Sequence, residues 1–166
     1  MTALQWILTL ILLQRGLELV WARHNTVRLR RQGAIEADAE GYSFIVLLHA
    51  GWLASLAAFV PASTPPFWPL LALFALLQLG RVWVLASLGR YWTTRVITLP
   101  GAPLTCTGPF RYLRHPNYLL VIAEIAVLPL AFGALAIATV FSALNLVLIL
   151  RRIRIEDSFL APRRGL

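Results

Sequence analysis

The sequence of 166 residues contains no lysine and only one cysteine, and each shortage excludes a class of protein. Cys106 alone cannot form an internal disulfide, so a disulfide-stapled secreted scaffold is excluded. Neither a second cysteine nor a dense histidine cluster offers metal-ligand spacing, and we therefore expect no metal site. Because lysine is absent, the net charge of +8 comes from fifteen arginines set against seven acidic residues.

Charged side chains are scarce as well, at 13% of the chain, whereas 59% of the residues are hydrophobic. This composition is typical of membrane proteins, and the length suits a single domain over residues 1–166. In a soluble protein the basic charge would indicate nucleic acid, but these arginines flank apolar runs, where lipid headgroups and topology explain them better. We expect contacts with membrane lipids and none with nucleic acid, and the sequence leaves the oligomeric state open.

Long apolar runs dominate the chain and lie at residues 2–21, 42–60, 67–86 and 117–150. A membrane-spanning helix needs about 20 such residues. The last run is interrupted between Pro129 and Gly133, which favours two short antiparallel helices. The first run lacks a signal peptide's basic start and cleavage site, so we expect a retained helix in which Arg15 and Glu18 pair or snorkel. The prediction is an all-α integral membrane protein with about five transmembrane helices.

Arginines concentrate in three segments that a five-helix path places on one side of the membrane. Four follow the first run, where we expect a water-exposed connection, four lie in the long loop at 87–115, and five follow Leu150. The connections near Pro61 and Pro129 have none. The positive-inside rule then predicts a cytoplasmic C-terminus and an external N-terminus. Together the three segments are expected to form a polar chamber that a soluble cofactor enters from water and a lipidic substrate enters sideways.

The most polar segment of the loop is Gly108 to Tyr118, which contains two arginines, a histidine and two prolines. Pro116 suits the first position of a helix, which puts His115 at or beside the N-cap. Unpaired N–H groups there, joined by Arg111 and Arg114, predict an anion site for a carboxylate or phosphate. The alternative is that these residues only mark a membrane boundary and a helix start.

Three segments, 88–95 (LGRYWTTR), 107–118 (TGPFRYLRHPNY) and 152–160 (RIRIEDSFL), resemble in order the motifs of the isoprenylcysteine carboxyl methyltransferase family. The resemblance covers residues 81–160, and its R-H-P-x-Y element also occurs in phospholipid N-methyltransferases and some membrane sterol reductases. It implies an integral-membrane enzyme without a Rossmann domain that moves a methyl group from S-adenosylmethionine to an oxygen of a lipidic acceptor.

Carried over by position, the resemblance implies cofactor contacts for five residues: His115, Pro116, Tyr118, Glu156 and Asp157. Asp157 stands where the family usually has a second Glu, Thr94 stands where eukaryotic members often have His, and the C-terminal segment is short. The chain is more similar to bacterial members associated with type III polyketide synthases, which methylate long-chain alkylpyrones or alkylresorcinols, and this implies a bacterial cell membrane.

For the acceptor, a cation such as Arg95, Arg111 or Arg114 could hold the oxygen, and Tyr91, Trp92 and Phe110 could form aromatic walls. Glu124, an ionisable residue within a membrane segment, is a further catalytic candidate. Each candidate has a plainer alternative: His115 as a helix cap, Glu156 as a partner of Arg152, Glu124 as a hydrogen-bonding group, and Tyr91 and Trp92 as interfacial anchors. His49 is left open. The alternatives for the whole chain are methylation of a prenylcysteine-like carboxylate or a non-catalytic lipid-binding scaffold.

Overall fold

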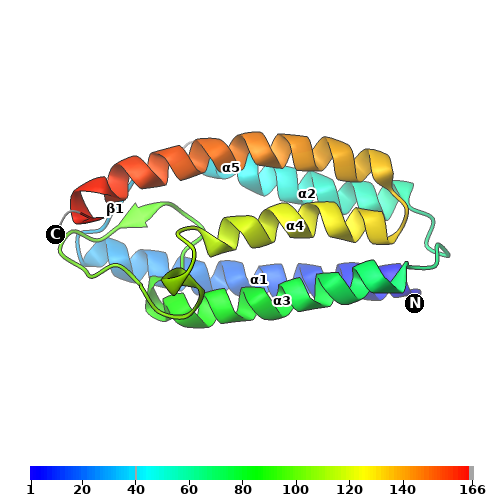
Figure 1. Ribbon diagram of the computed structural model, residues 1–166, viewed down its shortest axis with the longest axis horizontal. Coiled ribbons are helices and arrows are strands. Elements are labelled where there is room, and N and C mark those ends of the chain that lie inside the picture. The colour runs from blue at the N-terminus through cyan, green and yellow to red at the C-terminus, as the bar shows by residue number, and fades with distance from the viewer. Residues whose placement is uncertain (40, 165–166) are drawn as a thin grey trace.

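Five α-helices aligned along one axis build the described part of the protein (Figure 1). The computed structural model describes residues 1–39 and 41–164, so residues 40, 165 and 166 of the predicted domain lie outside the described part. In that part the elements are α1 (Ala3–Arg31), β1 (Ile35–Glu36), α2 (Gly41–Phe59), α3 (Trp68–Leu88), η1 (Gly89–Tyr91), β2 (Ile97–Thr98), η2 (Gly108–Arg111), α4 (Pro116–Ala131) and α5 (Leu135–Arg164). The all-α membrane architecture is confirmed.

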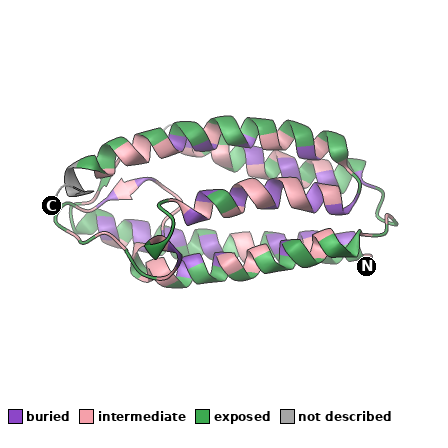
Figure 2. Cartoon of the chain, viewed as in Figure 1, coloured by how far each residue is buried: buried purple, intermediate pink, exposed green. Residues whose placement is uncertain are grey.

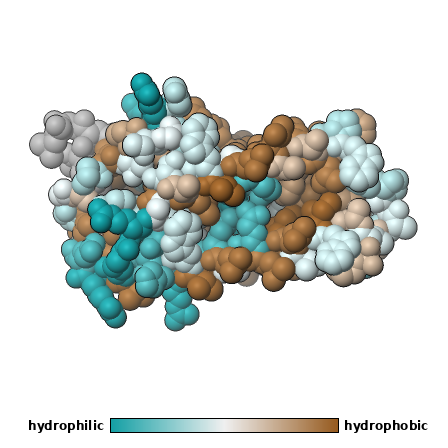
Figure 3. Space-filling model, turned by 90° about the horizontal axis from the view of Figure 1, so that it is seen from below, coloured by the Kyte–Doolittle hydropathy of each residue, from teal (hydrophilic) through white to brown (hydrophobic). Residues whose placement is uncertain are grey.

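Within the described residues, α1, α2, α3 and α5 are long and apolar enough to cross a membrane. The 16 residues of α4 make it shorter, at roughly 24 Å against a hydrocarbon core of about 30 Å. The outward faces of the helices are exposed (Figure 2). Large apolar residues such as Leu17, Leu79 and Val147 are among the exposed ones. Hydrophilic residues gather at the end that holds the long loop (Figure 3). Apolar outward faces along the helices and a hydrophilic end are typical of a multi-pass membrane protein.

The first helix is ten residues longer than its apolar run. We expected the arginines after Trp21 in a water-exposed connection, but α1 continues through Arg31, so this prediction is wrong. No glycine or proline interrupts residues 17–32, and arginine is a good helix former that complements the dipole of a helix C-terminus. Gly33, with a φ of 88°, then ends the helix as its N–H donates to Arg30 O and the next N–H donates to Leu29 O.

The predicted hairpin in the last apolar run is confirmed as α4 and α5. Pro129 lies inside the last turn of α4, which ends at Ala131, and Gly133 follows two residues later with a φ of 68°. The N–H groups of Gly133 and Ala134 donate to Leu130 O and Pro129 O, which closes the helix end as at Gly33. The turn therefore directs α5 back along α4 toward the arginine-rich end (Figure 1).

The core lies around α4, which packs against both α3 and α5. Its largest fully buried side chains include Ile125 and Leu128 of α4 together with Trp52 and Leu56 of α2. A Cβ atom at Gly80 of α3 would lie 3.1 Å from Leu120, so the absence of a side chain there permits the close approach of α3 and α4. The shortest of the five described α-helices is thus fixed at the centre of the bundle.

A two-residue antiparallel pairing, which the sequence did not predict, joins the first arginine-rich segment to the long loop. Ile35 pairs with Thr98, and Glu36 pairs with Ile97. Both strands lie at the end of the bundle where α5 also finishes, while the N-terminus and the two uncharged turns lie at the opposite end (Figure 1). The three arginine-rich segments therefore share one end, as the five-helix path predicted.

Candidate active site

A cavity of about 560 Å³ opens at the arginine-rich end and is lined by residues of all five helices and the long loop. Its wall is polar toward β1 and β2, and apolar deeper along α2, where Ile45, Val46, Ala50 and Leu53 line it. The long loop covers it through residues 91–99 and 102–106. The chamber expected from the sequence is present, and both water-facing and membrane-facing elements contribute to it.

Four of the five predicted cofactor residues form one cluster where α4 begins and α5 leaves the bundle. The Tyr118 hydroxyl donates to Glu156 Oε2 at 2.5 Å, and His115 Nδ1 lies 3.8 Å from the same oxygen. His115 Nε2 donates to Asp157 Oδ1 at 3.0 Å. The rings of His115 and Tyr118 stack with centroids 5.4 Å apart. Residues about 40 apart in sequence therefore converge on the cavity.

The N-terminus of α4 explains this convergence. Pro116 occupies the first helical position and His115 is the N-cap, as predicted, but the histidine side chain makes no cap hydrogen bond. Because its ring nitrogens point to the acidic pair of α5 instead, the interpretation of His115 as a helix cap alone is wrong. Pro116 is buried and lines the cavity beside it.

Arg152 holds the same cluster to the long loop, a role that sequence reasoning missed. Its Nε donates to the Tyr118 hydroxyl at 3.1 Å, and its Nη2 donates to Thr94 O at 2.5 Å. We considered Arg152 only as a helix partner of Glu156, whereas Glu156 accepts a hydrogen bond from Tyr118. The available signal was spacing, since Arg152 precedes Glu156 by one helical turn and faces the same way.

Arg95 is fixed at the opposite side of the cavity by β1. Its Nη1 donates to Glu36 Oε1 at 2.6 Å, and its guanidinium lies 4.4 Å from the centre of the Tyr42 ring. Arg30 also donates to Glu36. Burial alone would favour the neutral carboxyl, but the hydrogen bonds and charges of the two arginines lower the pKa of Glu36. Glu36 thus stays ionised and holds Arg95 against the cavity.

The other two predicted cations lie differently. Arg114 is exposed and lines the cavity, whereas Arg111 is exposed on η2 and outside the cavity lining. The anion site expected from both of them together stays a prediction, with Arg114 the better placed.

Trp92 is only 3% exposed and packs with Ala22, Val84 and Leu85. The interpretation of Trp92 as an interfacial anchor is therefore wrong. Its carbonyl accepts a hydrogen bond from Asn25 Nδ2 at 2.9 Å, which attaches the loop to α1. Trp92, Tyr91 and Phe110 all line the cavity.

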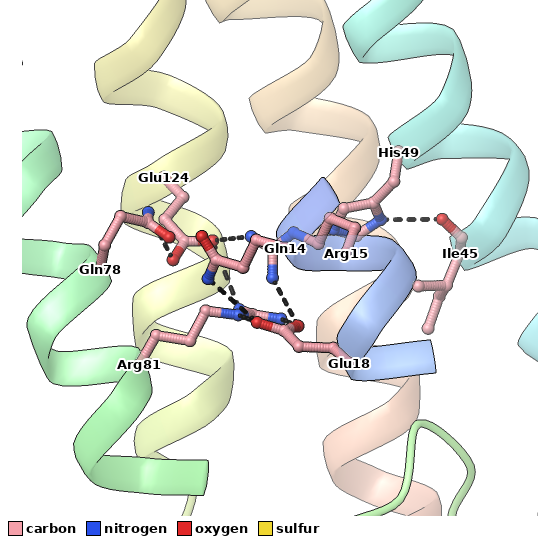
Figure 4. Close-up of polar contacts among 8 residues, drawn as sticks. All are labelled: Gln14, Arg15, Glu18, Ile45, His49, Gln78, Arg81 and Glu124. Carbon is pink, nitrogen blue, oxygen red and sulfur yellow. Dashed lines mark hydrogen bonds and ion pairs between the residues drawn. The ribbon is translucent and has the colours of Figure 1, made fainter. Parts of the chain in front are cut away.

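Glu124 belongs to a buried ion cluster beside the cavity (Figure 4). It accepts from Arg15 Nη2 at 2.5 Å and from Arg81 Nη1 at 3.4 Å. Arg81 also donates twice to Glu18, each time at 2.7 Å, and Arg15 donates to Glu18 at 3.0 Å, which confirms the predicted pairing within α1. Arg15, Glu18 and Arg81 line the cavity and Glu124 lies behind them. A catalytic role for Glu124 stays a prediction.

Comparison with known proteins decides the family. A model of the isoprenylcysteine carboxyl methyltransferase (ICMT) family matches residues 70–162, a range that contains the whole cluster around His115 and Glu156. The chain belongs to this family. It is also 39% identical over 160 residues to the uncharacterized protein YpbQ of Bacillus subtilis (strain 168), a match that covers 93% of this chain and 95% of YpbQ. No solved structure matches the chain.

Membership of the ICMT family makes this protein a membrane methyltransferase by kind. The matched range begins in α3 and ends in α5, so the family region includes the floor of the cavity, the loop above it and the acidic pair. The helices α1 and α2 lie before it and supply the opposite, largely apolar wall. The family region and the largely apolar wall of the cavity thus come from different parts of the chain.

Proposed function

We propose that this ICMT-family protein is an S-adenosylmethionine-dependent O-methyltransferase that acts on a ring hydroxyl of a long-chain lipid, an alkylpyrone or alkylresorcinol. The observation that carries the proposal is a single cavity with two kinds of wall. Carboxylates, arginines and stacked rings surround its loop end, whereas apolar side chains of α2 line its deeper part, opposite the ion cluster of Arg15, Glu18 and Arg81. A polar methyl donor and an apolar acceptor could both bind in this cavity, whereas in water the apolar acceptor would not dissolve beside the donor.

The residues at the loop end suit the donor. S-adenosylmethionine has an ammonium group and a ribose diol, which carboxylates bind, and a carboxylate, which a cation binds. Glu156 lines the cavity and Asp157 lies next to it outside the lining, with side chains 27% and 36% exposed, and Arg114 supplies a cation. Asn117, which lines the cavity, has a buried Oδ1 atom without a hydrogen-bond partner among the described residues. The volume of about 560 Å³ is within the usual range for a small-molecule site.

When bound, S-adenosylmethionine supplies a methyl group on a sulfonium sulfur, which keeps the electron pair of the breaking carbon–sulfur bond. The protein's part is alignment and exclusion of water, since charge is neutralised as the new bond forms. His115, Tyr118 and Glu156 restrain one another on two helices, and Arg152 ties them to Thr94 in the loop. These contacts fix the donor end relative to the apolar wall.

The acceptor is argued from the walls of the cavity. Tyr42, Tyr91, Trp92 and Phe110 line it and offer flat surfaces for a planar ring. An alkyl chain could follow the apolar side chains of α2 toward the middle of the bundle. A prenylcysteine carboxylate would need a cation of its own, and Arg95 is already held by Glu36. We further propose that the arginine-rich end faces the cytoplasm, where the donor is made.

Donor binding is tested first by isothermal calorimetry of detergent-solubilised protein with S-adenosylhomocysteine. Binding should be specific in the wild type and lost in Glu156→Gln and His115→Ala. Arg154→Gln is the matched control on the same helix, because Arg154 is exposed and outside the cavity lining. A folded wild type that does not bind would argue for a lipid-binding scaffold instead, and variants that bind as well as the control would show that the donor site is assigned to the wrong residues.

Acceptor choice is tested by competition. Membranes containing the protein are given labelled S-adenosylmethionine with equal amounts of an alkylpyrone or alkylresorcinol and S-farnesylcysteine. We expect the label chiefly in a base-stable aryl or enol ether of the ring compound. Label found chiefly in a base-labile methyl ester of the prenylcysteine would show that the enzyme is a carboxyl methyltransferase and that our acceptor is wrong.

A further inference from the structure

His49 is a polar side chain in the otherwise largely apolar α2 wall of the cavity. The cavity-lining residues of this helix recur at helical spacing from Tyr42 to Leu53, and His49 lies between the polar mouth and the apolar depth. It is half-buried, and the sequence left its role open. The contacts described above give it no part in the donor cluster.

A hydrogen bond fixes the tautomer of this histidine. Nδ1 lies 2.8 Å from the carbonyl oxygen of Ile45, one turn earlier in α2 (Figure 4). A carbonyl oxygen only accepts, so Nδ1 carries the proton, and in the neutral ring Nε2 then carries the lone pair. Among the described residues Nε2 has no hydrogen-bond partner. Nε2 of His49 is therefore available as a proton acceptor at the cavity wall.

The charged groups that face His49 from packed helices are Arg15 of α1, Glu124 of α4 and Arg152 of α5. Arg15 is itself paired with Glu18 and Glu124, and Arg152 donates to Tyr118 and Thr94. Because these three groups already have partners of their own, none of their contacts has to break when His49 accepts a proton from a ligand.

A second, smaller cavity shows where an alkyl chain attached to that ligand would lie. This groove has a volume of about 290 Å³ and is lined only by apolar side chains: Leu8, Leu12, Ala50, Leu53, Ala54 and Ala57. It shares Ala50 and Leu53 with the main cavity, so the two adjoin along α2. Ala50 directly follows His49. A lipid whose chain fills the groove therefore brings its first polar group to the level of the histidine.

We propose that His49 is the general base of methyl transfer, and that the acceptor accordingly carries a neutral hydroxyl on a ring at the head of an alkyl chain. This inference rests on the function proposed above and narrows it. The O–H bond breaks as an Nε2–H bond forms, so the oxygen gains the electron pair with which it takes the methyl group. The imidazolium then releases its proton to water. A carboxylate acceptor is already ionised and would have no use for such a base.

The effect of removing the base follows from the acidity of the acceptor. A resorcinol hydroxyl resembles the phenol of tyrosine, with a pKa of about 10, so roughly one molecule in a thousand is ionised at pH 7. General bases contribute about 10²- to 10⁴-fold to rate. We expect His49→Gln to lower the rate of transfer to an alkylresorcinol at pH 7 by about 10²- to 10⁴-fold. For an enolic pyrone, which is more acidic, the loss of rate should be smaller.

The pH profile separates a base from a structural residue. The wild-type rate should rise with pH and level off once the imidazole is neutral. In His49→Gln the rate should keep rising about tenfold per pH unit toward pH 9, because the acceptor must then ionise by itself. Added imidazole should partly restore His49→Ala. His24→Gln is the matched control, since His24 is exposed on α1 and outside the cavity lining.

A readout without turnover uses the low histidine content, three residues in all. In ¹⁵N-histidine-labelled protein saturated with S-adenosylhomocysteine, an alkylresorcinol should shift the Nε2 resonance of His49, assigned by its loss in His49→Gln. The dimethyl ether of the same compound cannot donate a hydrogen bond and should leave it in place. An unmoved resonance, with binding of the alkylresorcinol verified by calorimetry, would overturn the proposal.

The two proposals fail differently. If the wild type methylates a ring hydroxyl and His49→Gln does so with the same rate and pH profile while remaining folded, the base is refuted and the proposed function stands. If the wild type methylates only carboxylates, the proposed acceptor is refuted and the base with it.

Discussion

The buried ion cluster permits a sharp prediction about stability through Arg81. Its guanidinium donates to both oxygens of Glu18 at 2.7 Å, and to Glu124 at 3.4 Å. The side chains of Arg81, Glu18 and Glu124 are only 7%, 8% and 2% exposed. With Arg15, the four formal charges sum to zero. Replacement of Arg81 by Met keeps an unbranched side chain but leaves two carboxylates facing one arginine.

The expected cost is about 3–5 kcal/mol in the free energy of unfolding, the range measured when one partner of a buried ion pair is removed. A second substitution, Glu18→Gln, restores neutrality because Arg15 then faces Glu124 alone at 2.5 Å. The double variant should therefore be more stable than Arg81→Met by about 2 kcal/mol or more, since residues in one network are not additive. The comparison needs the two single variants, the double variant and the wild type.

Unfolding in mixed detergent micelles, followed by circular dichroism, measures these differences. Arg23→Met is the matched control, because Arg23 is exposed on α1 and should change stability by no more than about 0.5 kcal/mol. If Arg81→Met is no less stable than this control, the cluster does not carry the charge balance assigned to it. If the double variant loses as much stability as Arg81→Met and Glu18→Gln lose together, the cluster likewise does not carry this charge balance.

Three further predictions concern topology, acid stability and the groove. Cysteines at Ile35 and Ser63 should be labelled from opposite sides of the membrane, the first together with native Cys106; labelling of both from one side would refute the five-helix path. Because arginine contacts lower its pKa despite burial, Glu36 stabilises the fold above its unfolded pKa, and this contribution is lost as pH falls through the lower folded pKa. Glu36→Gln should therefore be less stable than wild type at pH 7 and approach it in strong acid, and equal stability at both would contradict the pairing. Ala54→Trp should lower transfer to long-chain relative to short-chain acceptors about tenfold, since two displaced methylenes cost about 1.6 kcal/mol. Ala58→Trp, outside the groove, should not, and an unchanged ratio in Ala54→Trp would mean that the chain lies elsewhere.

Hydropathy was sufficient to predict the helices, because a membrane-spanning helix requires a long apolar run and few other structures contain one. It failed where polar residues continue a helix. The arginines after Trp21 are polar and also good helix formers, so composition marks the membrane boundary there but not the end of α1 at Arg31. The pairing of β1 with β2 was missed because two-residue strands carry no periodic pattern.

Some features of the candidate site could likewise be predicted from the sequence, and others could not. The convergence of His115 with Glu156 followed from motif resemblance, which already encodes contacts across the fold. The ion cluster could not be predicted, because Arg81 and Glu18 are 63 positions apart and a single sequence contains no sign that they touch. His49 shows a third case: its residue type was visible, but its tautomer depends on the hydrogen bond to Ile45.

The charge arrangement around the cavity bears on whether a cationic donor can bind there at all. Five arginines line it, at positions 15, 81, 95, 114 and 152, against the two carboxylates Glu18 and Glu156, and unpaired arginines would repel a sulfonium. Further negative charge lies behind the wall, because Glu124 contacts the first two arginines and Glu36 contacts the third. Neither of these carboxylates lines the cavity, so they offset part of the arginine charge without occupying space that a ligand needs. Seen in this way, Glu124 need not touch a reacting atom to matter for a methyl donor. Its position suits a residue that lets positively charged side chains and a positively charged ligand share one cavity.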